Sequence, residues 1–268
     1  MNDILVAVGK RLGERWMTMI ALPGLAYVGI SVWAILCAQR HALDPAFLAA
    51  RTRALTHDGR DLATLVLSAI LALGIATLVG SIAVMVAEKV VHRWWIREAS
   101  TAARTRLQTE ARARWQARTP MPPTRYLPTR ATAIGEAFRL LGERADVEYG
   151  LSLVHAWPRL WLLIDADSRK VLTEAHRRYF ADAALVSWGM LYLPWVIWWW
   201  PAGIIAVTCI TTGRWRARDS SRGLAALFES ALDIHQAKLA AALGVSLPEG
   251  RITVPLGNQI NDILSKRM

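Results

Sequence analysis

Three long stretches without a charged residue constrain the fold of this 268-residue chain more than any other feature. They run over residues 16–39, 62–87 and 183–213, and most of their residues are apolar. Since a helix rises about 1.5 Å per residue, the first two are long enough to cross a hydrocarbon core of about 30 Å. Soluble domains rarely contain even one such stretch. We therefore exclude a soluble single-domain enzyme and predict an all-α membrane protein.

The third stretch is too long for one untilted helix and short for two ordinary ones. It contains the segment Pro194-Trp-Val-Ile-Trp-Trp-Trp-Pro201. Tryptophan favours the membrane–water interface, and proline suits the first turn of a new helix. We therefore predict a second transmembrane hairpin over residues 181–213, with one helix ending near Trp199, the next beginning at Pro201, and the turn near residues 199–201.

The distribution of basic residues predicts the topology. The net charge is +11, and residues 88–178 hold 17 Lys and Arg against 10 Asp and Glu. Loops rich in Lys and Arg stay in the cytoplasm. Four transmembrane helices in two hairpins, with spans 16–39 and 62–87 in the first, keep both basic regions and both termini inside. We expect a multi-pass protein of the bacterial inner membrane that contacts anionic lipid headgroups, and we do not expect nucleic acid as a partner.

The remaining segments are predicted to be helices, linkers and loops outside the bilayer. Residues 1–15 form an interfacial helix, and residues 40–61 form an outward loop. A basic helical arm (88–118) continues the second span, and a Pro-rich linker follows it (119–130). A cytoplasmic helical region (131–180) and C-terminal helices (214–268), the last from about Pro255, then form a helical bundle.

Side chains typical of membrane interfaces flank the predicted spans. These anchors are Lys89, Arg93, Trp94, Trp95, Trp195, Trp198, Trp199, Trp200, Arg214, Trp215 and Arg216. Inside the second span, Ala72, Ala76 and Gly80 recur at four-residue intervals. Small residues let helices approach closely in lipid. This stripe either packs against the first span or forms the seam of a homo-oligomer.

A first candidate site consists of His155, Trp157, Arg159 and Trp161. An arginine among tryptophan rings can receive a phosphate or a carboxylate of a partner. The alternative is structural, with Arg159 tied to a helix end or to a carboxylate such as Asp165.

A second candidate site consists of Glu229, Asp233 and His235. Paired acids can hold a metal ion or share a proton. The alternative is internal pairing with nearby arginines, for which Arg139, Arg144 and Arg159 are the candidates. Asp182, at the inner edge of the third span, is a functional candidate by its position. It can instead pair locally with Arg177, Arg178 or Arg214.

The sequence lacks the common catalytic motifs. It contains no phosphate-binding glycine loop, no paired cysteine motif and no metalloprotease spacing. We therefore predict no enzymatic activity, no cofactor and no metal site.

Several motifs resemble one family. They are Thr132-Ala-Ile-Gly135, the segment 149–161 with its Trp157-Pro-Arg-Leu-Trp161 core, Phe228-Glu-Ser-Ala-Leu-Asp-Ile-His235 and Ala242-Leu-Gly-Val-Ser-Leu-Pro248. The chain resembles, over roughly residues 125–264, an uncharacterised family of integral membrane proteins frequent in GC-rich Gram-positive bacteria. It departs from that family at Asp165-Ala-Asp167. The resemblance implies the membrane architecture and no known activity.

The sequence favours a non-enzymatic membrane module whose cytoplasmic helices bind a cytosolic protein partner or sense a signal. One version is a membrane effector of a bacterial defence system. An oligomeric channel or pore is the first alternative. A lipid enzyme at the membrane interface is the second, and it would use His155 with Asp165, or Glu229 with His235.

Overall fold

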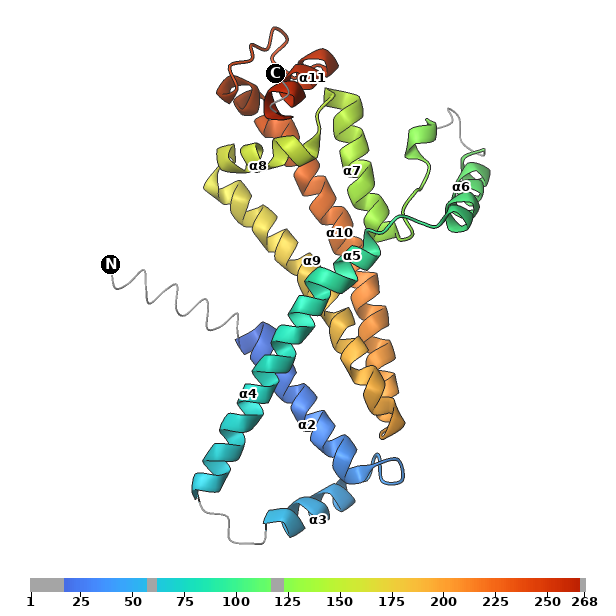
Figure 1. Cartoon of the computed structure of the whole chain (residues 1–268), viewed down its shortest axis with the longest axis vertical. Helices are drawn as coiled ribbons and strands as arrows, with labels where there is room; N and C mark the ends of the chain where they lie inside the picture. Colours follow the sequence, from blue (N-terminus) through green and yellow to red (C-terminus); the bar gives the residue numbers. More distant parts are fainter. Residues whose placement is uncertain (1–16, 57–61, 117–122, 266–268) are drawn as a thin grey trace, which may run out of the picture. The chain divides into compact units, whose positions relative to one another are not determined.

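The computed structural model describes residues 17–56, 62–116 and 123–265, and the chain is all-helical over them (Figure 1). Within these ranges the only paired extended residues are Glu98 and Arg130, which form an isolated bridge. The chain divides into two compact units. Unit 1 comprises residues 1–91 and 181–214, and unit 2 comprises residues 92–180 and 215–268. The predicted interfacial helix over residues 1–15 lies outside the described residues.

Two helical segments are long and apolar enough to cross a membrane, judged by length and composition. The first, Val66–Trp95, includes most of α4 (Leu62–Val86), a π-helical turn (Ala87–Val91) and α5 (His92–Trp95). The second, Ala166–Ile197, consists of α9 (Ala166–Tyr192) and a 3-10 helix (Leu193–Ile197). Helix α2 (Leu22–Cys37), which follows a π-helical turn at Met17–Ala21, is apolar but shorter.

Helices α2 and α4 of unit 1 pack through small residues. A Cβ atom on Gly24 would lie 2.1 Å from the carbonyl oxygen of Ala76, and one on Gly80 would lie 2.6 Å from that of Ile20. Ala76 and Gly80 are buried, whereas Ala72 is partly exposed. The stripe therefore packs within the chain, and its inner part is not open as a seam between copies.

The 181–213 segment contains the predicted turn. Helix α10 (Pro201–Ala242) begins at Pro201, as predicted. Helix α9 ends at Tyr192, and the helical segment continues as a 3-10 helix to Ile197, close to the predicted end near Trp199. Pro194 lacks the N–H that an α-helix requires, and the chain tightens into the 3-10 helix there. Beside the turn, a Cβ atom on Gly189 would lie 2.8 Å from the carbonyl oxygen of Ala206, so the two helices are in close contact.

Residues 40–61 are not simply a loop, because α3 (Pro45–Thr56) lies within them. Asp44 caps this helix: its Oδ1 accepts hydrogen bonds from the backbone N–H groups of Ala46 and Phe47, both at 3.0 Å. Pro45 occupies the first helical position, where its fixed φ is suitable. The local signals for a helix start were present, and the loop prediction was wrong over 45–56.

The predicted continuous arm over 88–118 is interrupted. Helix α5 ends at Trp95, and α6 (Thr101–Trp115) begins after the cap residue Ser100. Two residues far along the sequence bind the backbone at this break. Thr132 Oγ1 donates to the carbonyl oxygen of Trp95, and Arg130 Nη1 donates to that of Ile96, both at 2.6 Å. These bonds satisfy carbonyl groups that a continuing helix would use. After the linker, in which Thr124–Tyr126 form a short 3-10 helix, α7 (Ala133–Tyr149) begins.

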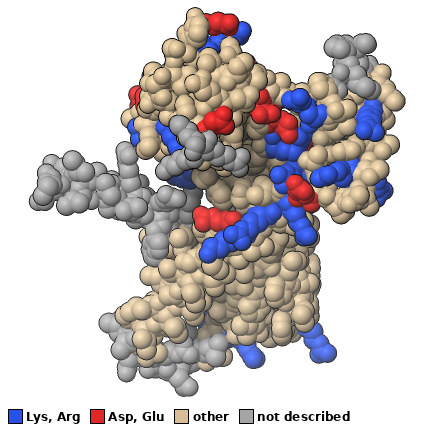
Figure 2. Space-filling model, turned by 45° about the horizontal axis from the view of Figure 1, so that its top comes forward, with Lys and Arg blue, Asp and Glu red and all other residues tan. Residues whose placement is uncertain are grey.

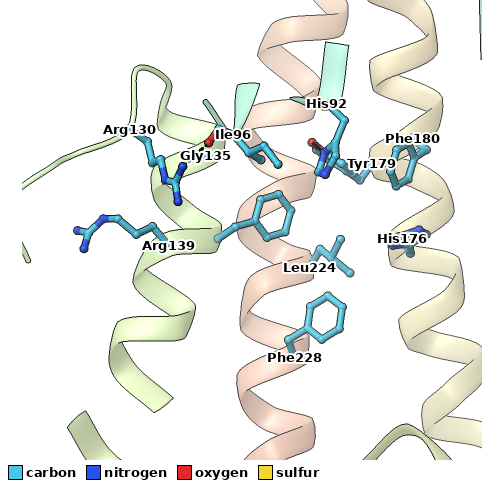
Figure 3. Close-up of a pocket in the computed structure, with 11 residues that line it drawn as sticks. His92, Ile96, Arg130, Gly135, Arg139, His176, Tyr179, Phe180, Leu224 and Phe228 are labelled. Atoms are coloured by element: carbon cyan, nitrogen blue, oxygen red, sulfur yellow. Dashed lines mark hydrogen bonds between the residues drawn. The ribbon is translucent and has the colours of Figure 1, made fainter. Parts of the chain in front are cut away.

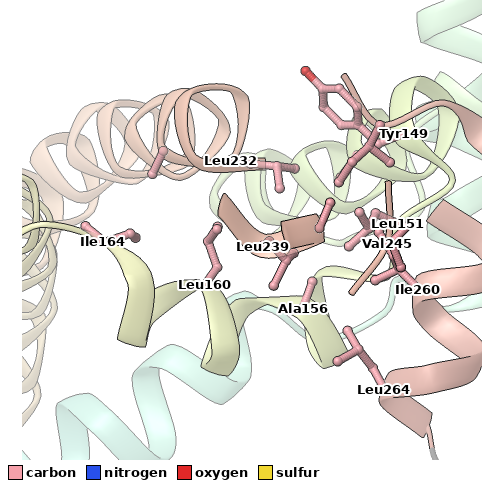
Figure 4. Packing of buried hydrophobic residues seen from close by; sticks show 14 of the residues in the cluster. Tyr149, Leu151, Ala156, Leu160, Ile164, Leu232, Leu239, Val245, Ile260 and Leu264 are labelled. Carbon is pink, nitrogen blue, oxygen red and sulfur yellow. The ribbon is translucent and has the colours of Figure 1, made fainter. Parts of the chain in front are cut away.

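The core of unit 2 lies where α7, α8 (Leu153–Leu163), α10 and α11 (Val254–Ser265) meet (Figure 4). Its largest fully buried side chains include Leu151, Leu160, Ile164, Leu232, Leu239 and Ile260. Gly150 ends α7 in the left-handed conformation with φ of 63°. Helix α10 ends at Ala242, two residues before Gly244, and α11 begins at Val254, next to Pro255; both agree with the prediction.

Replacement of Gly24 by alanine is expected to destabilise unit 1 by about 1–3 kcal/mol, because the added methyl group overlaps the backbone of Ala76. The matched control is Gly29→Ala on the same helix, where a Cβ atom meets nothing within 4 Å. Thermal unfolding of the purified protein in detergent measures both. Equal unfolding temperatures for the two variants would contradict the packing described.

Candidate functional site

Asp165 and His235, two of the predicted site residues of unit 2, are in side-chain contact. Asp165 lies between α8 and α9 and caps α9, since its Oδ2 accepts the backbone N–H of Ser168 at 2.9 Å. Its Oδ1 lies 3.2 Å from Nε2 of His235, a side chain on α10 that is only 3% exposed. The other ring nitrogen of His235 lies 3.1 Å from the carbonyl oxygen of Ala231. The hydrogen bonds from Ser168, then that with His235, lower the pKa of Asp165 to about 2.

The other predicted acids bind side chains of α7. Glu229 pairs with Arg144 at 3.0 Å, one of the internal pairs considered from the sequence. Asp233 accepts a hydrogen bond from the hydroxyl of Tyr149 at 2.8 Å. Burial and the neighbouring Asp233 raise the pKa of Tyr149, so its phenol stays protonated. Both acids thus form side-chain contacts between α10 and α7.

The tryptophans of α8 face the core of unit 2. The rings of Trp157 and Phe228 are 4.2 Å apart between centroids and nearly perpendicular, and Trp157 also lies 6.0 Å from Trp161. Arg159 donates from Nη1 to the carbonyl oxygen of His155 at 2.8 Å. Arg159 therefore binds the backbone in the first turn of its own helix. This is a structural role, as in the alternative in which Arg159 is tied to a helix end.

The pairs required by the lipid-enzyme alternative are not formed. His155 lies 3.1 Å from Ser152 Oγ, and Asp165 contacts His235 instead. Glu229 is engaged by Arg144. Within residues 17–56, 62–116 and 123–265, no three His, Cys, Asp or Glu side chains lie together so that they could hold a metal ion.

Two predicted interface anchors are buried instead. Trp95 is 1% exposed, and its ring centroid lies 6.1 Å from that of Tyr179 in unit 2. Trp199 is 5% exposed and donates from Nε1 to the carbonyl oxygen of Ala42 at 2.9 Å. Each ring has a partner in the fold that sequence spacing does not reveal, and this contact keeps it from the surface.

The other anchors are more accessible. Trp195 is partly buried and donates to the hydroxyl of Tyr27 at 2.8 Å. The exposed anchors are Lys89, Arg93, Trp94, Trp198, Trp200, Arg214, Trp215 and Arg216.

Asp182 is buried in unit 1, at 7% exposure.

Sequence reasoning missed an aromatic cavity of about 400 Å³ in unit 2 (Figure 3). Its wall includes Phe138, Tyr179, Phe180 and Phe228, with His92 and His176 between the rings. The His92 ring accepts or donates at Nδ1 to the Tyr179 hydroxyl, 2.8 Å away. These residues come from four helices, so no local spacing could have predicted the cavity.

A groove between α9 and α10 of unit 2 is larger, with a volume of about 700 Å³. Its apolar residues are Val171, Ala175, Gly223, Leu224 and Leu227, and its charged residues are Asp167, Lys170, Glu174 and Arg178. Val171 is 53% exposed, and a Cβ atom on Gly223 would meet nothing within 4 Å. The groove therefore has an accessible apolar surface with both signs of charge along it.

Comparison with protein-family models, with curated proteins and with solved structures finds no match to this chain.

Substitution of Asp165 by asparagine is expected to weaken the pH dependence of stability in acid. The pKa of Asp165 in the folded chain, about 2, lies below its ordinary value of 3.8, so the ionised carboxylate stabilises the fold above about pH 4. That contribution is lost as the pH falls from about 4 to about 2. Circular dichroism of unfolding over this range should show a smaller decrease for Asp165→Asn than for wild type. A decrease as large as that of wild type, or one matched by Asp167→Asn, would contradict the contact.

Proposed function

We propose that the chain is a four-span protein of the bacterial inner membrane, with both termini in the cytoplasm, and that unit 2 binds a cytosolic protein partner. In this proposal the four spans are those expected from the sequence, and they would correspond to α2, α4, the end of α9 and the start of α10. The protein acts without catalysis, as a membrane-anchored docking or sensing module.

The exposed apolar surface of unit 1 supports the membrane part of this proposal. Leu67, Ile70, Leu71 and Leu78 on α4 are each more than 60% exposed, and Ile35 on α2 is 65% exposed. Within Val66–Trp95, only 17% of the most apolar 18-residue stretch is buried, so this segment does not resemble the core helix of a soluble protein. Contiguous apolar surface of this kind indicates contact with lipid or protein.

The groove between α9 and α10 carries the docking part of the proposal. An amphipathic helix binds by placing apolar residues in such a groove, while its flanks meet charged residues at the rim. Gly223 and Ala175 leave room for the backbone of a bound helix to approach. At the rim Glu174 pairs with Arg177 and Arg178, which leaves a basic excess with Lys170 and favours a partner helix with acidic residues at its flank.

Cysteine labelling tests the topology. In a chain whose native Cys37 and Cys209 are replaced by alanine, single cysteines are placed at the exposed positions Ala50, Thr124 and Ala241. An impermeant maleimide should label position 50 in intact spheroplasts and label positions 124 and 241 only after permeabilisation. Labelling of 124 and 241 from opposite sides would exclude the second hairpin.

Photo-crosslinking tests the groove as the docking site. A photoreactive phenylalanine derivative at Val171 should give one adduct of defined mass in native cells. Gly223→Trp fills the groove and should reduce this adduct at least tenfold. Gly142→Trp on α7 is the control, because that glycine also faces open space and does not line the groove. An adduct that survives Gly223→Trp, or that fails to form, would remove the docking role.

A further inference from the structure

Three arginines line a second cavity of unit 2, with a volume of about 470 Å³. Arg114 comes from α6, Arg130 from the segment before α7, and Arg218 from α10. Lys and Arg side chains are also visible over α6 on the face shown in Figure 2. Much of the remaining wall is apolar or aromatic, with Leu107, Ala111, Trp115, Tyr126, Pro128 and Leu140.

The acid on the wall of this cavity, Glu136, is already neutralised. Its Oε2 accepts the backbone N–H groups of Thr129 and Arg130, both at 3.2 Å. Its Oε1 accepts the Nε–H of Arg139 at 2.9 Å, within an ion pair that is 10–15% exposed. Glu136 therefore has little capacity left to offset the charge of the three arginines in the cavity.

The acids near two of these arginines also bind them weakly. Glu110 lies 3.9 Å from Arg114, and both side chains are well exposed. Glu98 lies 4.0 Å from Arg130 and is 67% exposed. Exposed pairs at such distances contribute little, and a ligand anion can replace them. The cavity therefore keeps a positive potential.

Arg130 is held in position before any ligand arrives. Its Nη1 donates to the carbonyl oxygen of Ile96 at 2.6 Å, and the side chain is 31% exposed. The remaining guanidinium donors can serve a ligand, and a planar guanidinium suits bidentate contact with oxyanions. The first turn of α7, at Ala133, also lines the cavity and adds a partial positive charge.

We propose that this cavity binds a phosphate ester, with the phosphate between Arg114, Arg130 and Arg218 and the apolar part against Trp115 and Tyr126. A phosphate carries up to two negative charges and accepts several charge-assisted hydrogen bonds, which matches three guanidinium groups better than a carboxylate does. The same chemistry is found in a lipid headgroup and in a soluble phosphate ester. The site does not depend on the docking groove.

Binding to the full chain in detergent distinguishes these sources. The probes are pyrophosphate and dioctanoyl phosphatidic acid, with dioctanoyl phosphatidylcholine as the zwitterionic comparison, followed by calorimetry and native mass spectrometry. Binding of pyrophosphate, with or without phosphatidic acid, shows that the cavity needs no lipid tail and assigns a soluble phosphate compound. Binding of phosphatidic acid alone assigns a lipid headgroup. In either case the affinity should fall as salt is raised.

The double variant Arg114→Gln/Arg218→Gln should lower the affinity of the bound probe by at least about a hundredfold, roughly tenfold for each charge-assisted contact. The matched control is Arg112→Gln/Arg222→Gln, which removes two exposed arginines from the same helices outside the cavity and should leave the affinity unchanged. Circular dichroism checks that both variants fold. Failure of both anionic probes to bind, equal binding of phosphatidylcholine, or an equal loss in the control pair would overturn the proposal.

Discussion

The side-chain amide of Asn261 joins α11 to the turn between α7 and α8, and the hydrophobic core of unit 2 is built from these same helices. It donates to the carbonyl oxygen of Gly150 at 2.8 Å and accepts the N–H of Ser152 at 2.9 Å. Both backbone groups belong to the turn between α7 and α8, where no helix supplies a partner. A buried group left unpaired costs about 1–3 kcal/mol, so the turn and α11 stabilise each other. Gly257 allows this approach, because a Cβ atom there would lie 1.8 Å from the carbonyl oxygen of Tyr149.

The two units achieve stability by different means. In unit 1, backbones approach at Gly24, Gly80 and Gly189, and large apolar side chains face outward. Close packing of small residues is the main attraction that remains where surroundings are as apolar as the chain. In unit 2, large apolar side chains form a buried core, and carboxylates and arginines also join the helices, as in the pair of Glu229 with Arg144. Water screens such pairs and hydrates their exposed parts, so each contributes only modestly to stability.

Local sequence signals predicted much of the helical fold. Pro201 begins α10, Gly244 follows its end, and the long uncharged segments are helical wherever the structure describes them, apart from the turns at residues 38–39 and 198–200. The missed helix α3 had local signals at Asp44 and Pro45, whereas two other errors arose where residues far apart in the sequence decide. The break after Trp95 depends on Thr132 and Arg130, more than thirty positions away. The burial of Trp199 depends on Ala42.

The candidate sites show the same limit. Arg144 was among the expected partners of the acids on α10, but the contact of Asp165 with His235 was not predicted, because 70 positions separate the two residues. The arginine cavity combines α6, α7 and α10, and a basic helix alone gave no reason to expect a cavity. A sequence pattern with helical period identifies faces of one helix, whereas a site formed by several helices requires their packing.

Gln39 has a consequence for biosynthesis. Its amide donates to the carbonyl oxygens of Val196 and Ile197, at 3.0 and 2.8 Å, and accepts the N–H of Trp200 at 3.1 Å. The ribosome makes Gln39 157 residues before Val196. During that interval the backbone groups that Gln39 binds have not yet been made. These three hydrogen bonds can therefore form only after the tryptophan-rich turn is translated, so this end of unit 1 is completed late in synthesis.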